Sequence, residues 1–279
     1  MISRPSSIMV WTSAISVLVT TASVLGLVDP GTYASETKNW ATQAQGQDIG
    51  NLLAVGTLLL SGYAYSKGSQ RAAQVWLGTL LYLVYAYVVY AMAVHFNELF
   101  LVYVAALGLS SYAVFFAVDR LRAAHEPTTD PAARKIAGCT SVVIGVLFAL
   151  LWLGELIPAT LSGDRPQSVV DAGLWVNPIH VIDLAILLPA LVIVGARTLR
   201  GESAGLFFVG PLLVFSVLMG ASIVAAMILM TAQGFDGTVP PLVMVCVVVL
   251  ASAFAAARYL TPSRASARRA SVERARTPR

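Results

Sequence analysis

The chain has 279 residues, of which 57% are hydrophobic and only 11% are charged, and its mean hydropathy is +0.77. A soluble domain carries about 25% charged residues, so this chain has too few charges to coat a water-soluble globule. The net charge of +4 comes from basic residues that are dispersed or gathered near the C-terminus, a pattern that excludes a basic nucleic-acid-binding face. The composition therefore predicts a protein whose partner is the lipid bilayer.

Eight apolar stretches are long enough to cross the hydrocarbon core as helices. Such a helix needs about 20 apolar residues, because lipid offers no water to satisfy open backbone groups. The stretches lie near residues 8–27, 49–66, 73–94, 98–119, 136–159, 178–198, 204–232 and 239–259. We expect an all-α, polytopic transmembrane helix bundle over residues 1–260 and a basic, disordered tail over 261–279. The first stretch is too long for a signal-peptide core and reads as a retained anchor; its removal would leave seven spans.

The Lys and Arg residues indicate the orientation of this bundle. If the N-terminus is inside, all but Lys38 and Arg165 of the 18 Lys and Arg residues fall on the inner side. Cytoplasmic loops carry such an excess. We therefore expect a plasma (inner) membrane protein with both termini in the cytoplasm. The expected spans hold no Lys or Arg at their centres, which disfavours a voltage sensor or a retinal-binding lysine.

Small and aromatic residues mark the expected contacts between helices. Gly138, Ser141 and Gly145 follow one side of the fifth stretch, and Gly220 and Ala226 lie in the seventh. Small residues let helices approach closely in lipid, where no hydrophobic force drives them together. We therefore expect these positions to be bundle contacts.

Tyrosines crowd the third stretch, and a buried tyrosine requires a partner for its hydroxyl group. They either pack the helices together or line a ligand cavity; the residues are Tyr82, Tyr85, Tyr87 and Tyr90, with Tyr103 and Tyr112 in the fourth stretch. We expect Trp40 and Trp175, in the outer connections, to be anchors at the membrane interface.

Polar residues that are costly in lipid crowd the outer ends of the expected helices. They are Asp48, Asn51, His95, Asn97, Glu98, Glu155, Asn177, His180 and Asp183. Helix capping explains some of them, because Asp or Asn at a helix start accepts hydrogen bonds from open amide groups. We expect Asp48 to cap the second helix, Asn97 with Glu98 the fourth, and Asn177, followed by Pro178, the sixth.

The sixth stretch holds the clearest constellation. A spacing of three places Asn177, His180 and Asp183 on one helix face. This face should turn away from lipid and form either a hydrogen-bond network between helices or a functional pocket. Glu155 lies near the C-terminal end of its helix, where a carboxylate is unfavourable; it therefore either reaches headgroup water or is protonated or paired inside the bundle.

These residues predict an outward-facing polar pocket that binds or transfers a small or lipid-like ligand. The pocket would lie beneath two long outer connections, and residues 35–45 would form a separate surface helix capped by Ser35 that serves as a lid. The expected ligand-binding residues are Asp48, Asn51, Tyr90, His95, Glu98 and Asn177.

Two other classes of function remain open. An integral membrane enzyme would use Glu155 or Asp183 as acid and His180 or His95 as base or metal ligand. His95, His180 and Asp183 could hold a divalent metal, since imidazole and carboxylate are common ligands, and the two histidines could instead hold a haem. A structural subunit of a membrane complex or a homo-oligomer would use the polar residues only to tie its helices together.

Overall fold

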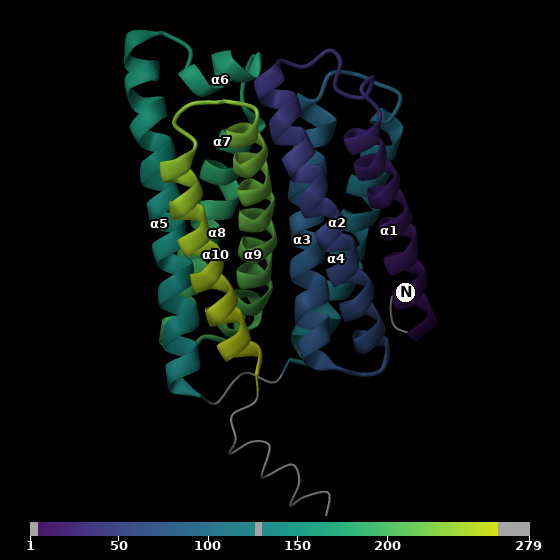
Figure 1. The fold of residues 1–279 in the computed structure, drawn as a ribbon. Helices are drawn as coiled ribbons and strands as arrows, with labels where there is room; N and C mark the ends of the chain where they lie inside the picture. The colour runs from purple at the N-terminus through teal and green to yellow at the C-terminus, as the bar shows by residue number, and fades with distance from the viewer. Residues whose placement is uncertain (1–4, 126–129, 262–279) are drawn as a thin grey trace, which may run out of the picture.

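The computed structural model describes residues 5–125 and 130–261, and these residues are helical apart from the connections (Figure 1). The elements are α1 (Pro5–Val28), α2 (Lys38–Ser66), α3 (Gln70–Ala93), α4 (Phe100–Ala123), α5 (Pro131–Ser162), α6 (Gln167–Ala172), α7 (Pro178–Ile182), η1 (Asp183–Leu187), α8 (Leu188–Arg200), α9 (Ser203–Ala232) and α10 (Val239–Leu260). The tail expected over 261–279 falls, beyond residue 261, outside the described residues.

Eight helices or helix runs in the described ranges are long and apolar enough to cross a membrane. One of them is the run of α7, η1 and α8 over Pro178–Arg200. This result confirms the all-α, polytopic prediction and the eight stretches. Helix length and hydropathy thus identify a multi-pass membrane protein that associates with a lipid bilayer.

The spans form two units of four helices each. In the N-terminal unit, α2 packs on α1 and α3, and α4 closes the ring by packing on α3 and α1. In the C-terminal unit, α8 packs on α5 and α9, and α10 closes the ring in the same way. Figure 1 shows the two units side by side, with the α1–α2 and α9–α10 connections at its top, here named the upper end, and the N-terminus near the bottom.

The two units meet where α9 packs on α2 and α3. Glycines on α2 make this contact close: a Cβ at Gly46 would overlap the backbone of Ala226, and one at Gly50 would overlap Ser222. The spacing of four residues puts both glycines on one face of α2, opposite a matching pair of small residues on α9. The sequence predicted Ala226 as a contact position but neither Ser222 nor the two glycines of α2.

Glycines also bring α5 and α8 together. A Cβ at Gly138 would lie 3.0 Å from the Gly195 carbonyl oxygen, and a Cβ at Gly145 would lie 2.9 Å from that of Leu188. Between them, the Ser141 hydroxyl donates to the Leu191 carbonyl at 2.8 Å. These residues are bundle contacts, as expected.

The start of α2 differs from the sequence prediction. Residues 35–45 do not form a separate surface helix, because α2 begins at Lys38 and runs without a break to Ser66. Its N-cap is Thr37, whose hydroxyl accepts from the Trp40 amide, and not Ser35 or Asp48. Hydropathy did not predict these first turns of α2 because their composition is polar. Trp40 and several small residues in them are nevertheless buried against neighbouring elements.

The sixth span contains a π-helical turn, η1, which begins at Asp183, the last residue of the polar stripe. Pro189 cannot donate a backbone hydrogen bond, and its ring would clash with the carbonyl four residues earlier. The helix widens here, so that the Leu188 amide donates to the carbonyl of Asp183, five residues back. Wide turns of this kind recur at functional sites, and this one fixes the position of Asp183.

Candidate functional site

A cavity of about 160 Å³ lies between the two units. Both units line it, with Trp40 of α2 and Tyr90 of α3 on one side and Trp152 of α5 and Asp183 of η1 on the other. Most lining side chains are apolar or aromatic, and Asp183 is the only Asp, Glu, Lys or Arg among them. The cavity is therefore an apolar chamber with one carboxylic acid.

Asp183 is held by a donor from each unit. The Tyr85 hydroxyl donates to Oδ1 at 2.9 Å, and the Trp152 indole N–H donates to Oδ2 at 2.7 Å. Its side chain is largely buried, and none of the ion pairs in the described chain includes it. Asp183 thus faces the cavity in a fixed orientation without a cationic partner.

The stripe predicted on the sixth span is buried, as expected: Asn177, His180 and Asp183 are each at most 7% exposed. Asn177 is the N-cap of α7 and accepts from the Ile179 amide at 2.9 Å, as predicted. The His180 ring packs against that of Trp152 with centroids 4.6 Å apart. Its Nε2 has no hydrogen-bond partner in the described chain, but His180 itself does not line the cavity.

Glu155 ties α5 to α6. It is half-buried, and its Oε1 accepts from the backbone amide of Ser168 at 3.1 Å. Because that amide belongs to the first turn of α6, the carboxylate satisfies an open donor at a helix start. Glu155 does not line the cavity.

The connection through α6 covers the upper end of the cavity. Val169, Ala172 and Leu174 pack against Trp40, which lines the cavity. The Thr37 hydroxyl, at the start of α2, donates to the Asp171 carbonyl at 3.0 Å. The cover is therefore made by α6 together with the first turns of α2, and not by a separate helix over residues 35–45 as the sequence suggested.

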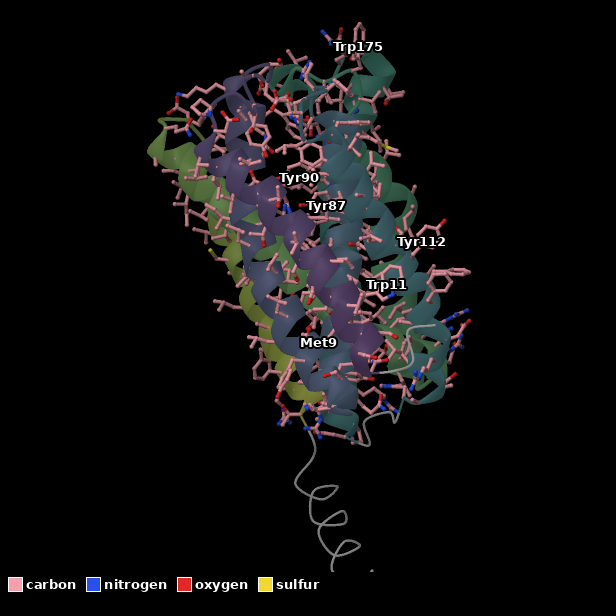
Figure 2. All side chains as sticks on the ribbon, turned by 90° about the vertical axis from the view of Figure 1, so that its right-hand side faces the viewer. Met9, Trp11, Tyr87, Tyr90, Tyr112 and Trp175 are labelled. Atoms are coloured by element: carbon pink, nitrogen blue, oxygen red, sulfur yellow. The ribbon has the colours of Figure 1, made fainter. Side chains whose placement is uncertain are left out.

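Trp40 is part of this cover and not an interfacial anchor as predicted. It is 4% exposed, and its indole N–H donates to the Ala93 carbonyl at 2.8 Å. Trp175, in contrast, is 91% exposed and lies at the upper tip of the molecule (Figure 2).

Asp48 forms a second buried acid site, inside the N-terminal unit. Its Oδ2 accepts from the Tyr33 hydroxyl at 2.7 Å and its Oδ1 from the Tyr90 hydroxyl at 2.8 Å. Gly26 of α1 leaves room for the carboxylate, since a Cβ there would overlap Oδ2. Burial, and then the adjacent Asp48, raise the pKa of Tyr33 well above its usual value, so its hydroxyl keeps the proton that it donates.

Tyrosines of α3 and α4 surround this second acid. The rings of Tyr87, Tyr90 and Tyr103 pack against one another with centroids 5.2 to 6.3 Å apart. Figure 2 shows Tyr87 and Tyr90 in the upper half of the bundle, well below Trp175. Asp48 itself does not line the cavity, whereas Tyr90 does.

Asn51 belongs to a polar network that joins the two units. Its Oδ1 accepts from the Tyr82 hydroxyl at 3.0 Å, and Gln47 donates to the same hydroxyl at 2.6 Å. Ser222 of α9 donates to Gln47 Oε1 at 3.1 Å. Gln47 and Ser222 line the cavity, but Asn51 lies behind them.

His95 does not join the other predicted site residues. It is exposed at the upper end, and its Nδ1 lies 2.9 Å from Oε2 of Glu36, a carboxylate that sequence reasoning overlooked. Glu98 is also exposed and does not line the cavity. Neither Asn97 nor Glu98 caps α4, which begins at Phe100; Asn97 instead accepts from the Leu99 amide at 2.9 Å.

The predicted metal site does not form. Within residues 5–125 and 130–261, no three His, Cys, Asp or Glu side chains come together in a way that could hold a metal ion. His95 pairs with Glu36, while Asp183 is bound by Tyr85 and Trp152. His95 is exposed at the upper end, whereas His180 is buried against Trp152, so the tertiary structure separates the residues that the sequence grouped.

No protein-family model, curated protein or solved structure matches this chain. The site must therefore be interpreted from its own geometry.

Proposed function

We propose that the protein binds a small, lipid-soluble ligand in the cavity between the two units, with Asp183 as its polar anchor. The observation that carries this proposal is a single carboxylate, fixed by Tyr85 and Trp152, on the wall of an otherwise apolar chamber. A carboxylic acid inside a membrane protein is costly and usually functional. A chamber with few, fixed polar groups is the common form of a small-molecule site.

The size of the cavity limits the ligand. Its volume of about 160 Å³ is close to the roughly 150 Å³ of an engineered protein cavity that binds benzene. Drug-sized ligands occupy pockets of roughly 300 Å³ or more. The cavity therefore suits a compact molecule with one ring, or the corresponding part of a longer lipid.

The test is ligand-induced stabilisation of the detergent-solubilised protein. Two compact probes, 2-phenylethanol and 2-phenylethylammonium, are added separately while the thermal unfolding midpoint is measured. A probe at ten times its Kd should stabilise the folded state by about 1.4 kcal/mol, because it binds only that state.

Two matched variants decide whether the cavity is the binding site. Ile223→Trp places a large ring in the cavity wall and should abolish the shift. Ile193→Trp makes the same change at a position that is 53% exposed and away from the cavity, and should leave the shift unchanged. No shift in the unmodified protein with either probe, or an equal shift in Ile223→Trp, would overturn the proposal.

We further propose that the upper end faces the outside of the cell and that both termini are cytoplasmic. The Lys and Arg distribution supports this orientation. In a background with Cys139 and Cys246 replaced by Ser, Arg165→Cys should react with a membrane-impermeant thiol reagent on intact cells, and Ala123→Cys should react only after lysis. The opposite pattern would contradict the orientation.

A further inference from the structure

The hydrogen-bond donors around the cavity are already in use. Each hydroxyl and indole group on its wall donates its hydrogen to another protein atom; these residues are Trp40, Tyr85, Tyr90, Trp152, Ser216 and Ser222. The amide nitrogen of Gln47 donates twice and that of Gln43 once. Among the side-chain donors of the lining residues, only one amide hydrogen of Gln43 is therefore left for a ligand.

Acceptors, in contrast, remain available. A carboxylate accepts about four hydrogen bonds, and Asp183 accepts two from the protein. A ligand that needs donors, such as a carboxylate or a quinone, would find almost none on this wall, and a carboxylate would also be repelled by Asp183. A ligand that brings its own N–H groups would meet a free acceptor.

The charge balance of the site favours the same kind of ligand. None of the ion pairs in the described residues includes Asp183. An ionised carboxylate in a low-dielectric site is costly unless it is paired with a cation. Aromatic rings also surround the chamber, with Trp40, Tyr85 and Tyr90 from one unit and Phe148, Trp152 and Phe215 from the other. Aromatic faces attract organic cations.

We propose that the ligand is a compact organic cation, such as a protonated amine, whose N–H groups bind the Asp183 carboxylate while its apolar part fills the aromatic chamber. This inference rests on the proposed function, because it assigns a chemical class to the ligand of the same cavity. The cation supplies a hydrogen-bond donor, which the cavity wall lacks. It also supplies a positively charged partner for the Asp183 carboxylate.

Three probes of similar size and different charge test this inference on the purified, detergent-solubilised protein. They are 2-phenylethylammonium, the neutral 2-phenylethanol and the anionic phenylacetate. Dissociation constants from calorimetric titration should show the cation binding at least about tenfold more tightly than the neutral probe, because a charge-assisted hydrogen bond replaces a neutral one. The anion should bind more weakly than both. This comparison uses the unmodified protein, so it does not depend on the folding of any variant.

A pair of variants then assigns the preference to one carboxylate. Asp183→Asn should remove the advantage of the cation over the neutral probe. Asp164→Asn makes the same change in an exposed connection and should retain the advantage. Unchanged selectivity in a folded Asp183→Asn protein would overturn the role of Asp183.

The outcomes separate this inference from the proposed function. If the neutral or anionic probe binds as tightly as the cation and Ile223→Trp blocks it, the cavity is a binding site but its ligand is not a cation. If none of the three probes binds, or if Ile223→Trp binds them normally, both proposals fail.

Discussion

Asp48 and Asp183 are comparable acids placed in the two units of the molecule. Each lies in the upper part of the second span of its unit. Each also accepts one hydrogen bond from a tyrosine of α3: Asp48 from Tyr90 and Asp183 from Tyr85. Their surroundings differ. Asp48 is completely buried and its second donor, Tyr33, comes from the α1–α2 connection of the same unit, whereas Asp183 lies on the wall of a cavity shared by both units.

The difference shows that the same residue type in corresponding spans of the two units can have two different roles. Both carboxylates accept two hydrogen bonds, but Asp48 is enclosed by its own unit and holds the α1–α2 connection against it, which is a structural role. Asp183 keeps free acceptor capacity that faces an open volume.

Gly46→Leu should have the largest effect, because it forces apart the units whose interface forms the cavity. The new side chain would collide with the backbone of Ala226, and backbone cannot move aside as a side chain can. We expect a loss of stability on the order of 4 kcal/mol or failure to assemble. Gly56→Leu on the same helix is the control, since nothing lies within 4 Å of a Cβ there. Equal thermal midpoints for the two variants would contradict the interface.

Asp48→Leu and Asp183→Leu compare the two acids directly. Each change leaves two donors without their acceptor, which costs about 1–3 kcal/mol per buried group. Asp48→Leu should show this full loss of stability, because its donors are enclosed by protein. The donors to Asp183 lie on the cavity wall, where they can find another partner. We therefore expect Asp48→Leu to lower the free energy of unfolding by at least about 1 kcal/mol more than Asp183→Leu. Only Asp183→Leu should weaken probe binding in a folded protein. Equal loss of assembly would indicate that both acids are structural.

Glu155→Gln should have the smallest effect and act on the cover of the cavity. The amide side chain can still accept from the Ser168 backbone, but without a charge, so the cap at the start of α6 should weaken by about 0.5–1 kcal/mol. Amide hydrogen exchange over Gln167–Ala172 should therefore become faster by roughly threefold. Unchanged exchange there, with a normal thermal midpoint, would contradict the tie between α5 and α6.

Local patterns were sufficient to predict the helices and some of their contacts. The apolar stretches located eight spans, Asn177 followed by Pro178 marked a helix start, and a spacing of three placed Asn177, His180 and Asp183 on one buried face. Each of these features depends on residues within a few turns of one another. The polar first turns of α2 were missed because their burial comes from other helices, not from their own composition.

The partners of each polar group, in contrast, depended on tertiary structure. Nothing in the sequence spacing relates Tyr85 to Asp183, which are 98 residues apart, or Tyr33 to Asp48 across a helix connection. Grouping His95 with His180 failed for the same reason, since a similar position along two helices does not say which side chains each residue will contact.

Composition and periodicity by themselves determined that this chain enters a membrane as a bundle of eight helices, because the cost of exposing backbone to lipid allows few alternatives. Only the packing of one unit against the other decided which carboxylate faces a cavity, because a cavity is a property of surfaces that meet from distant parts of the chain.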